Sequence, residues 1–140
     1  MAYLSTWTLG RRSVGRAEGA AFGPLAAPET VLWPGADVGA SDTWYGHART
    51  SYPGAPEYHL LFPHRWHLAA DQCAVHLLTS PDGVLWTAPP ENEVLTPGPF
   101  GARDAGGVHV GGGMVALRDR VAVPCTSYRV PPHDPCRAPL

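Results

Sequence analysis

Two Asp–His pairs with the same spacing are the residues of this chain best suited to chemistry. His47 follows Asp42 by five residues, and His109 follows Asp104 by five residues. Two carboxyl groups in one concave site can divide acid and base roles, because the nearby like charge raises the pKa of one of them. Hydrolysis of a glycosidic bond needs such a pair, one to protonate the leaving oxygen and one as base or nucleophile. The alternative is structural: each Asp caps a turn, and each His fills an equivalent position.

A polar and aromatic cluster at residues 64–67 is a second candidate. Arg65, Trp66 and His67 directly follow an apolar run that predicts a strand. Aromatic faces beside Arg and His suit sugar rings, which offer apolar C–H faces and many hydroxyl groups. An exposed loop with one packed Trp is the alternative.

A hairpin is predicted at residues 74–86. The turn Ser-Pro-Asp-Gly separates an apolar run from a segment that ends at Trp86. Asp82 can accept hydrogen bonds from turn amides, and Gly83 can adopt the positive φ that the turn requires. We therefore assign Asp82 to the turn and Trp86 to the core, and neither to catalysis.

The same elements occur twice along the chain. Four matches follow one another in the same order at nearly constant offset, which indicates two copies of a unit of about 62 residues. The matches are residues 31–35 with 94–98, Asp42 with Asp104, His47 with His109, and Pro63 with Pro124.

Composition favours one turn-rich β domain. The chain has 140 residues, of which 16 are Gly and 16 are Pro, so few windows could form a helix. A hydrophobic share of 44% is too large for a disordered tract. A net charge of −2 without a basic block argues against nucleic acid as a partner, and no apolar run is long enough for a membrane helix. Localisation stays open, with the cytoplasm as the default because no signal peptide is visible.

Strands and loops alternate in the predicted secondary structure. The strands are expected at 58–63, 74–79, 84–87, 107–110, 114–117 and 120–127, and the loops at 26–30, 88–92 and 97–101. The three cysteines have no metal-ligand spacing and are expected to be free thiols. We expect neither a metal nor another cofactor.

These segments resemble a known family. Residues 52–67, the Ser-x-Asp-Gly-x-x-Trp hairpin and the segment 103–106 are similar to five-bladed β-propellers of the glycoside hydrolase family 32/43 type. The resemblance implies an all-β fold of antiparallel blades with Asp-Gly hairpins, acting on a carbohydrate ligand near the propeller axis. The residues it points to are Asp42 and Asp104 as the catalytic pair, with His47, His109, Arg65, Trp66 and His67 as substrate-binding residues.

The expected domain is a single partial propeller over residues 1–140. One unit covers about 14–74, a second about 75–130, and an irregular Pro-rich tail covers 131–140. Closed propellers typically have four to eight blades, so we expect a fragment that needs further blades or self-association to cover its sheet edges. Three functions stay open: a glycosidase-like enzyme, a non-catalytic carbohydrate- or protein-binding propeller, and a fragment without activity of its own.

Overall fold

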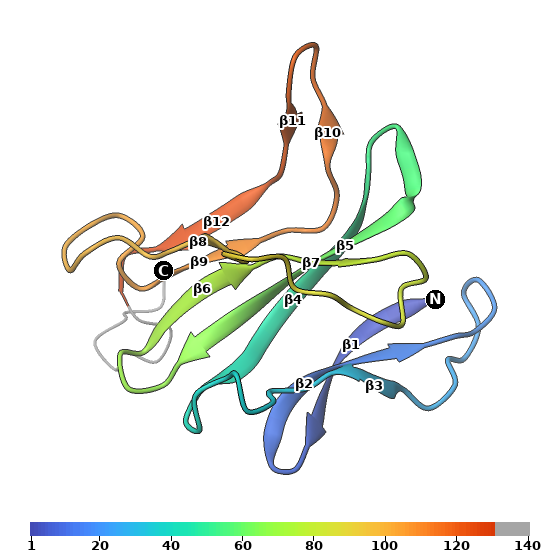
Figure 1. Ribbon diagram of the computed structural model, residues 1–140, viewed down its shortest axis with the longest axis horizontal. Helices are drawn as coiled ribbons and strands as arrows, with labels where there is room; N and C mark the ends of the chain where they lie inside the picture. Colours follow the sequence, from blue (N-terminus) through green and yellow to red (C-terminus); the bar gives the residue numbers. More distant parts are fainter. Residues whose placement is uncertain (131–140) are drawn as a thin grey trace.

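The computed structural model describes residues 1–130 and builds them entirely from strands, turns and loops (Figure 1). The prediction of an all-β chain is confirmed. Within residues 1–130, no helix is long and apolar enough to cross a membrane. The predicted Pro-rich tail, 131–140, lies outside the described residues.

Twelve strands form three sheets in the described part of the chain. The first sheet contains β1 (Ala2–Thr8), β2 (Arg11–Ala17) and β3 (Glu29–Leu32). The main sheet contains β4 (Thr43–Tyr52), β5 (Ala55–His67), β6 (Gln72–His76), β7 (Leu78–Ser80), β8 (Glu93–Leu95), β9 (Gly107–Val110) and β12 (Cys125–Tyr128). A small hairpin of β10 (Val115–Ala116) and β11 (Val121–Ala122) projects from it.

The main sheet curls into a half-barrel. Strands β4, β5, β6 and β8 pair antiparallel in succession, and β9 runs parallel to β6. Consequently β4, β6 and β9 all begin at the same end of the sheet. The register of β4 against β5 shifts between Trp44 and Gly46, and such irregularities bend a strand and increase its twist.

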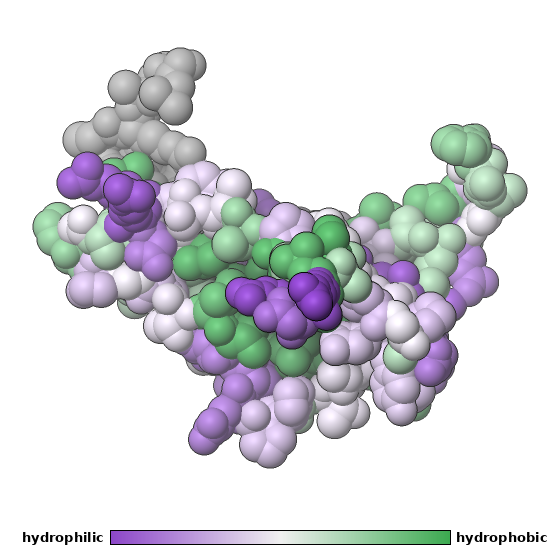
Figure 2. Space-filling view, turned by 90° about the horizontal axis from the view of Figure 1, so that it is seen from above, coloured by the Kyte–Doolittle hydropathy of each residue, from purple (hydrophilic) through white to green (hydrophobic). Residues whose placement is uncertain are grey.

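A compact apolar cluster lies within the curl. Its buried members come from four strands and are Ala48, Phe62, Val75, Val108 and Val110. Figure 2 shows hydrophobic side chains gathered in the middle of the face viewed from above. Burial of these side chains is the main force that holds the strands together.

The sequence repeat coincides with equivalent strand pairing. Val14 of β2 pairs with Leu32 of β3, and Val75 of β6 pairs with Leu95 of β8. Both pairings are antiparallel, and both have a register shift directly after the valine. In addition, β4 contacts β2 and β1 as β9 contacts β6 and β5. The hairpin β1–β2 followed by β3 therefore corresponds to the hairpin β5–β6 followed by β8.

The segment at residues 80–83 has the local hydrogen bonds expected of the Asp-Gly turn, but the hairpin is not confirmed, because the strand predicted at 84–87 is wrong. Gly83 has a φ of 72°, and the Asp82 Oδ1 accepts hydrogen bonds from the amides of Val84 (2.8 Å) and Leu85 (2.9 Å). Because these two amides donate to Asp82, they cannot form hydrogen bonds with a neighbouring strand. Only Thr87 pairs, in an isolated bridge with Thr79.

The other predicted strands lie at the right positions, but several differ in length from the observed strands. The strand at 107–110 is confirmed, and 58–63 lies inside the longer β5. The strand predicted at 120–127 is split into β11 and β12 at Pro124, which has no N–H for a ladder. Residues 26–30 are not wholly a loop, because β3 begins at Glu29. β1, β2, β3, β4 and β8 were not predicted from the sequence.

Candidate functional site

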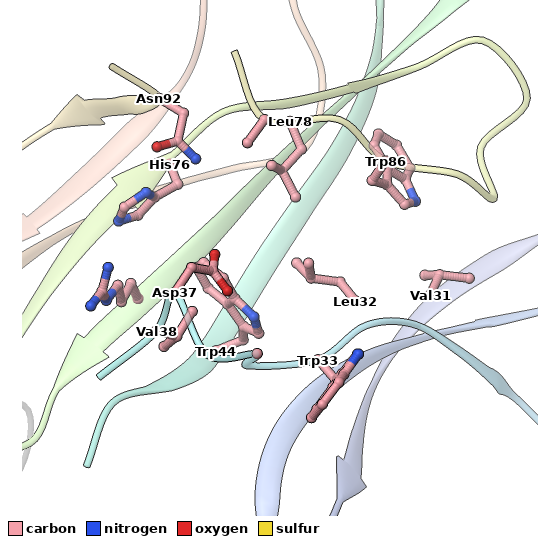
Figure 3. Close-up of a pocket in the computed structure, with 13 residues that line it drawn as sticks. Val31, Leu32, Trp33, Asp37, Val38, Trp44, His76, Leu78, Trp86 and Asn92 are labelled. Atoms are coloured by element: carbon pink, nitrogen blue, oxygen red, sulfur yellow. The ribbon is translucent and has the colours of Figure 1, made fainter. Parts of the chain in front are cut away.

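A cleft of about 490 Å³ lies between the segment 31–38 and the chain from β6 to Asn92 (Figure 3). In Figure 3 the labelled side chains form two facing rows. One row contains Val31, Leu32, Trp33, Asp37, Val38 and Trp44, and the other contains His76, Leu78, Trp86 and Asn92. The cleft therefore combines three tryptophans with a few polar groups, which is the usual composition of a small-molecule site.

Arg11 of β2 holds the first wall in place. Its guanidinium donates hydrogen bonds to the backbone carbonyls of Pro34 (3.1 Å), Gly39 (2.7 Å) and Asp42 (3.1 Å from Nε). Because a guanidinium presents its donors in a rigid fork, one side chain can order several carbonyls of a loop. The segment that carries Trp33 is thus fixed by contacts to the first sheet.

The second wall is positioned by the chain between β6 and β8. The ladder breaks at Leu77, whose amide donates to the carbonyl of Asn92 at 2.7 Å. Thr79 and Thr87 then exchange two backbone hydrogen bonds of 2.9 Å each, which closes the hairpin next to Trp86. Tyr3 completes the arrangement, because its ring meets Trp86 edge to face at 5.9 Å and its hydroxyl donates to the carbonyl of Gly83 at 2.6 Å.

The tryptophans of the cleft differ in exposure and in hydrogen bonding. Trp33 is 51% exposed, whereas Trp44 is buried. The Nε1 atoms of Trp44 and Trp86 are buried and have no hydrogen-bond partner among the described residues. A buried N–H without an acceptor costs about 1–3 kcal/mol.

The polar end of the cleft is formed by Arg65 and His76. His76 meets Trp44 edge to face at 5.6 Å, and its Nε2 lies 3.6 Å from a carboxylate oxygen of Glu93. Burial lowers the pKa of His76 below its ordinary value, so the ring is neutral at pH 7. Arg65 is neutralised by Asp42, and Asp37 remains as an exposed carboxylate at the rim.

Three of the residues predicted from the sequence meet at one point. The Oδ2 of Asp42 accepts hydrogen bonds from the Nε (3.1 Å) and an Nη atom (2.9 Å) of Arg65, and it lies 3.0 Å from the Nδ1 of His67. Asp42 is buried, and its carboxylate joins the start of β4 to the end of β5. These contacts show that the Asp42 carboxylate forms an ion pair with Arg65 in the fold.

Trp66 lies away from the large cleft. Its Nε1 donates to the Oδ1 of Asp71 at 2.8 Å, and its ring meets Tyr45 edge to face. Together with Trp7 and Asp42 it lines a smaller cavity of about 320 Å³. Trp7 and Trp66 occupy corresponding places in the two repeated hairpins.

The two predicted histidines group around a third, His64, which belongs to the predicted cluster at residues 64–67 but was not among the predicted substrate-binding residues. The rings of His64 and His109 are 4.6 Å apart, and the Nε2 of His64 accepts a hydrogen bond from the amide of Val110. Burial, with smaller effects of His109 and His47, lowers the pKa of His64 to about 4. Burial also lowers the pKa of His47 and of His109. All three rings are therefore neutral at pH 7.

Asp104 lies before β9, at the same end of the sheet as Asp42. Its backbone carbonyl accepts a hydrogen bond from the amide of Gly107 at 2.9 Å, and its carboxylate lies against Gly98. A Cβ on Gly98 would come within 2.5 Å of the Oδ1 of Asp104, so the glycine makes room for this side chain. Residues 1–130 contain no group of three or more His, Cys, Asp or Glu side chains that could hold a metal ion.

Most of the cleft could not be predicted from the sequence. Trp33 was noted only as part of the repeated segment 31–35, Trp44 belonged to no motif, and Trp86 was assigned to the core, although it lines the cleft. The only signal was the number of tryptophans, five in 140 residues. No family model, no curated protein and no solved structure matches this chain.

Proposed function

We propose that the chain binds a carbohydrate in the cleft of Trp33, Trp44 and Trp86. The observation that carries this proposal is a cleft of about 490 Å³ lined by three tryptophans, of which Trp33 is 51% exposed. A pyranose ring would pack its C–H face against the exposed indole of Trp33 and turn its hydroxyls towards the polar groups of the cleft. Asn92 and Asp37 supply further hydrogen-bonding groups for its hydroxyls.

We also infer that the repeated units are propeller-type blades. Support comes from the four-stranded antiparallel meander β4-β5-β6-β8 and from the equivalent pairing of β2 with β3 and of β6 with β8. Blades of propellers are four-stranded antiparallel sheets. Fold alone does not determine function, so the binding proposal depends on the cleft.

Calorimetric titration with neutral oligosaccharides tests the binding proposal. Trp33→Ala should weaken binding at least tenfold, because it removes one exposed aromatic wall, while the fold is retained. Trp7→Ala is the matched control, since Trp7 is 68% exposed and lines only the smaller cavity. Unchanged affinity in Trp33→Ala would overturn the proposal, and loss of affinity in Trp7→Ala alone would place the ligand in the smaller cavity.

Hydrolysis of a glycoside by Asp42 and Asp104 is the second candidate function. It is favoured by one observation: both residues precede strands that begin at the same end of the sheet. Asp104→Asn should then abolish release of the aryl group from aryl glycosides without lowering the melting temperature. Wild-type turnover in Asp104→Asn, or no turnover by the native protein, would leave binding as the function.

A further inference from the structure

The outer edge of β1 is the least protected sheet edge in the described part of the chain. β1 pairs with β2 along all seven of its residues, and no described strand pairs with its other edge, although the backbone of Tyr3 makes a hydrogen bond with His47 of β4. The strand Ala-Tyr-Leu-Ser-Thr-Trp-Thr contains no charged residue, no Pro and no Gly. Edges of this kind bind further strands, because their unpaired N–H and C=O groups form a template.

The other edge strands are shorter or carry charged and kinked positions. β3 has four residues and includes Glu29, and β8 has three residues and includes Glu93. β4 carries Arg49 and a register shift after Trp44. Short length, charge and bulges are the features by which proteins protect their edges. Among the edge strands of residues 1–130, only β1 is both long and uncharged.

The repeat indicates that a strand fits at this edge. In the β5–β6 hairpin, which corresponds to β1–β2, the outer edge of β5 is covered by β4 from Thr43 to Tyr52. Ser5 pairs with Val14 in the first hairpin as His64 pairs with Val75 in the second. The outer edge of β1 therefore corresponds to the edge of β5 that pairs antiparallel with β4.

We propose that β1 pairs antiparallel with β1 of a second copy of this chain. A two-fold axis through Ser5 would set Tyr3 opposite Trp7, and Leu4 opposite Thr6, without any like charges facing each other. A Tyr–Trp cross-strand pair contributes about 0.2–1 kcal/mol beyond alanines. The two three-stranded sheets would join into one of six strands, in an isologous interface typical of dimers.

Light scattering after size exclusion tests this dimer. The native protein should shift from monomer to dimer as its concentration rises. Ser5→Lys should hold it monomeric, because two lysines would then face each other at the axis. Leu85→Lys is the matched control: Leu85 is 73% exposed in the turn after β7, and its variant should dimerise like the native protein. A native monomer at all concentrations, or a dimer unaffected by Ser5→Lys, would overturn the proposal.

A disulfide at the axis gives a second readout that does not depend on dimer affinity. In a background of Cys125→Ser and Cys136→Ser, Ser5→Cys should form a covalent dimer under mild oxidation, since residues opposite each other in a strand pair have close Cβ atoms. Leu85→Cys in the same background should form it at least tenfold more slowly. Equal rates for the two variants would contradict pairing of β1 with its copy.

Discussion

Arg65 and Asp42 form a nearly buried ion pair that joins the end of β5 to the start of β4. Two nitrogens of the guanidinium donate to one carboxylate oxygen, at 3.1 and 2.9 Å, and the side chains are 20% and 11% exposed. Both groups also border a cavity, Arg65 the large cleft and Asp42 the smaller one. The pair therefore links the stability of the sheet to the shape of the candidate sites.

Asp42→Ala should lower the free energy of unfolding by about 2–3 kcal/mol. The substitution leaves the mostly buried Arg65 guanidinium without its partner, which is the costly way to break such a pair. Urea unfolding measures the effect. Arg65→Met is the matched variant, because it removes the other charge of the ion pair, that of the donor, and keeps the side-chain volume. If Asp42→Ala unfolds at the native urea concentration, the pair is not structural.

Asp82→Ala should lower the melting temperature by a few degrees and leave carbohydrate affinity unchanged. The Oδ1 of Asp82 accepts hydrogen bonds from two turn amides and from the hydroxyl of Ser80. The amides of Val84 and Leu85 hold the pKa of Asp82 below its ordinary value, so the charged form makes these bonds at pH 7. Asp82→Asn keeps an acceptor and should melt closer to the native protein. A native melting temperature combined with lost binding would assign Asp82 to the site instead.

Acid should destabilise the fold through His64. Its pKa is lowered to about 4 in the folded chain, against an ordinary value of 6.5, chiefly by burial. The unfolded chain therefore binds a proton more readily, and the stability that neutral His64 contributes is complete above pH 6.5 and is lost as the pH falls towards 4. By pH 4.5 this group alone costs roughly 2–3 kcal/mol.

Urea unfolding at pH 7.5 and pH 4.5 measures this loss in the native protein and in His64→Gln. The amide oxygen of Gln can accept the Val110 amide hydrogen bond but does not titrate. The variant should lose less stability between the two pH values than the native protein. His47, His76 and His109 titrate in the same direction and remain in both proteins. Equal losses would show that His64 is not the group responsible.

Leu61→Ala should destabilise the chain by about 2–5 kcal/mol. Leu61 is fully buried on β5, between Arg49 of β4 and Leu78 of β7, so truncation leaves a cavity at the centre of the sheet. Leu85→Ala serves as the control, because the exposed leucine should change stability by less than about 0.5 kcal/mol. Thermal unfolding of both variants gives the comparison. Similar melting temperatures would contradict the assignment of Leu61 to the core.

Some features of the structure could be predicted from the sequence, because they depend on local interactions. The turn at Asp82 and Gly83 depends on hydrogen bonds between residues at most three apart, so its residue types predict it. The all-β class follows from Gly and Pro that interrupt nearly every helical window. The repeat was visible because equivalent positions in the two units pair in the same way, as Val14 and Val75 do.

Only the tertiary structure decided where the functional groups meet. Trp33 and Trp86 are 53 residues apart and face each other because Arg11 orders one wall and Tyr3 supports the other. Asp42 meets Arg65 and His67 because β4 pairs with β5 in one particular register. A shift of one residue would move each side chain to the opposite face of the sheet. Residue types identify groups capable of chemistry, but strand register determines which of them share a cavity.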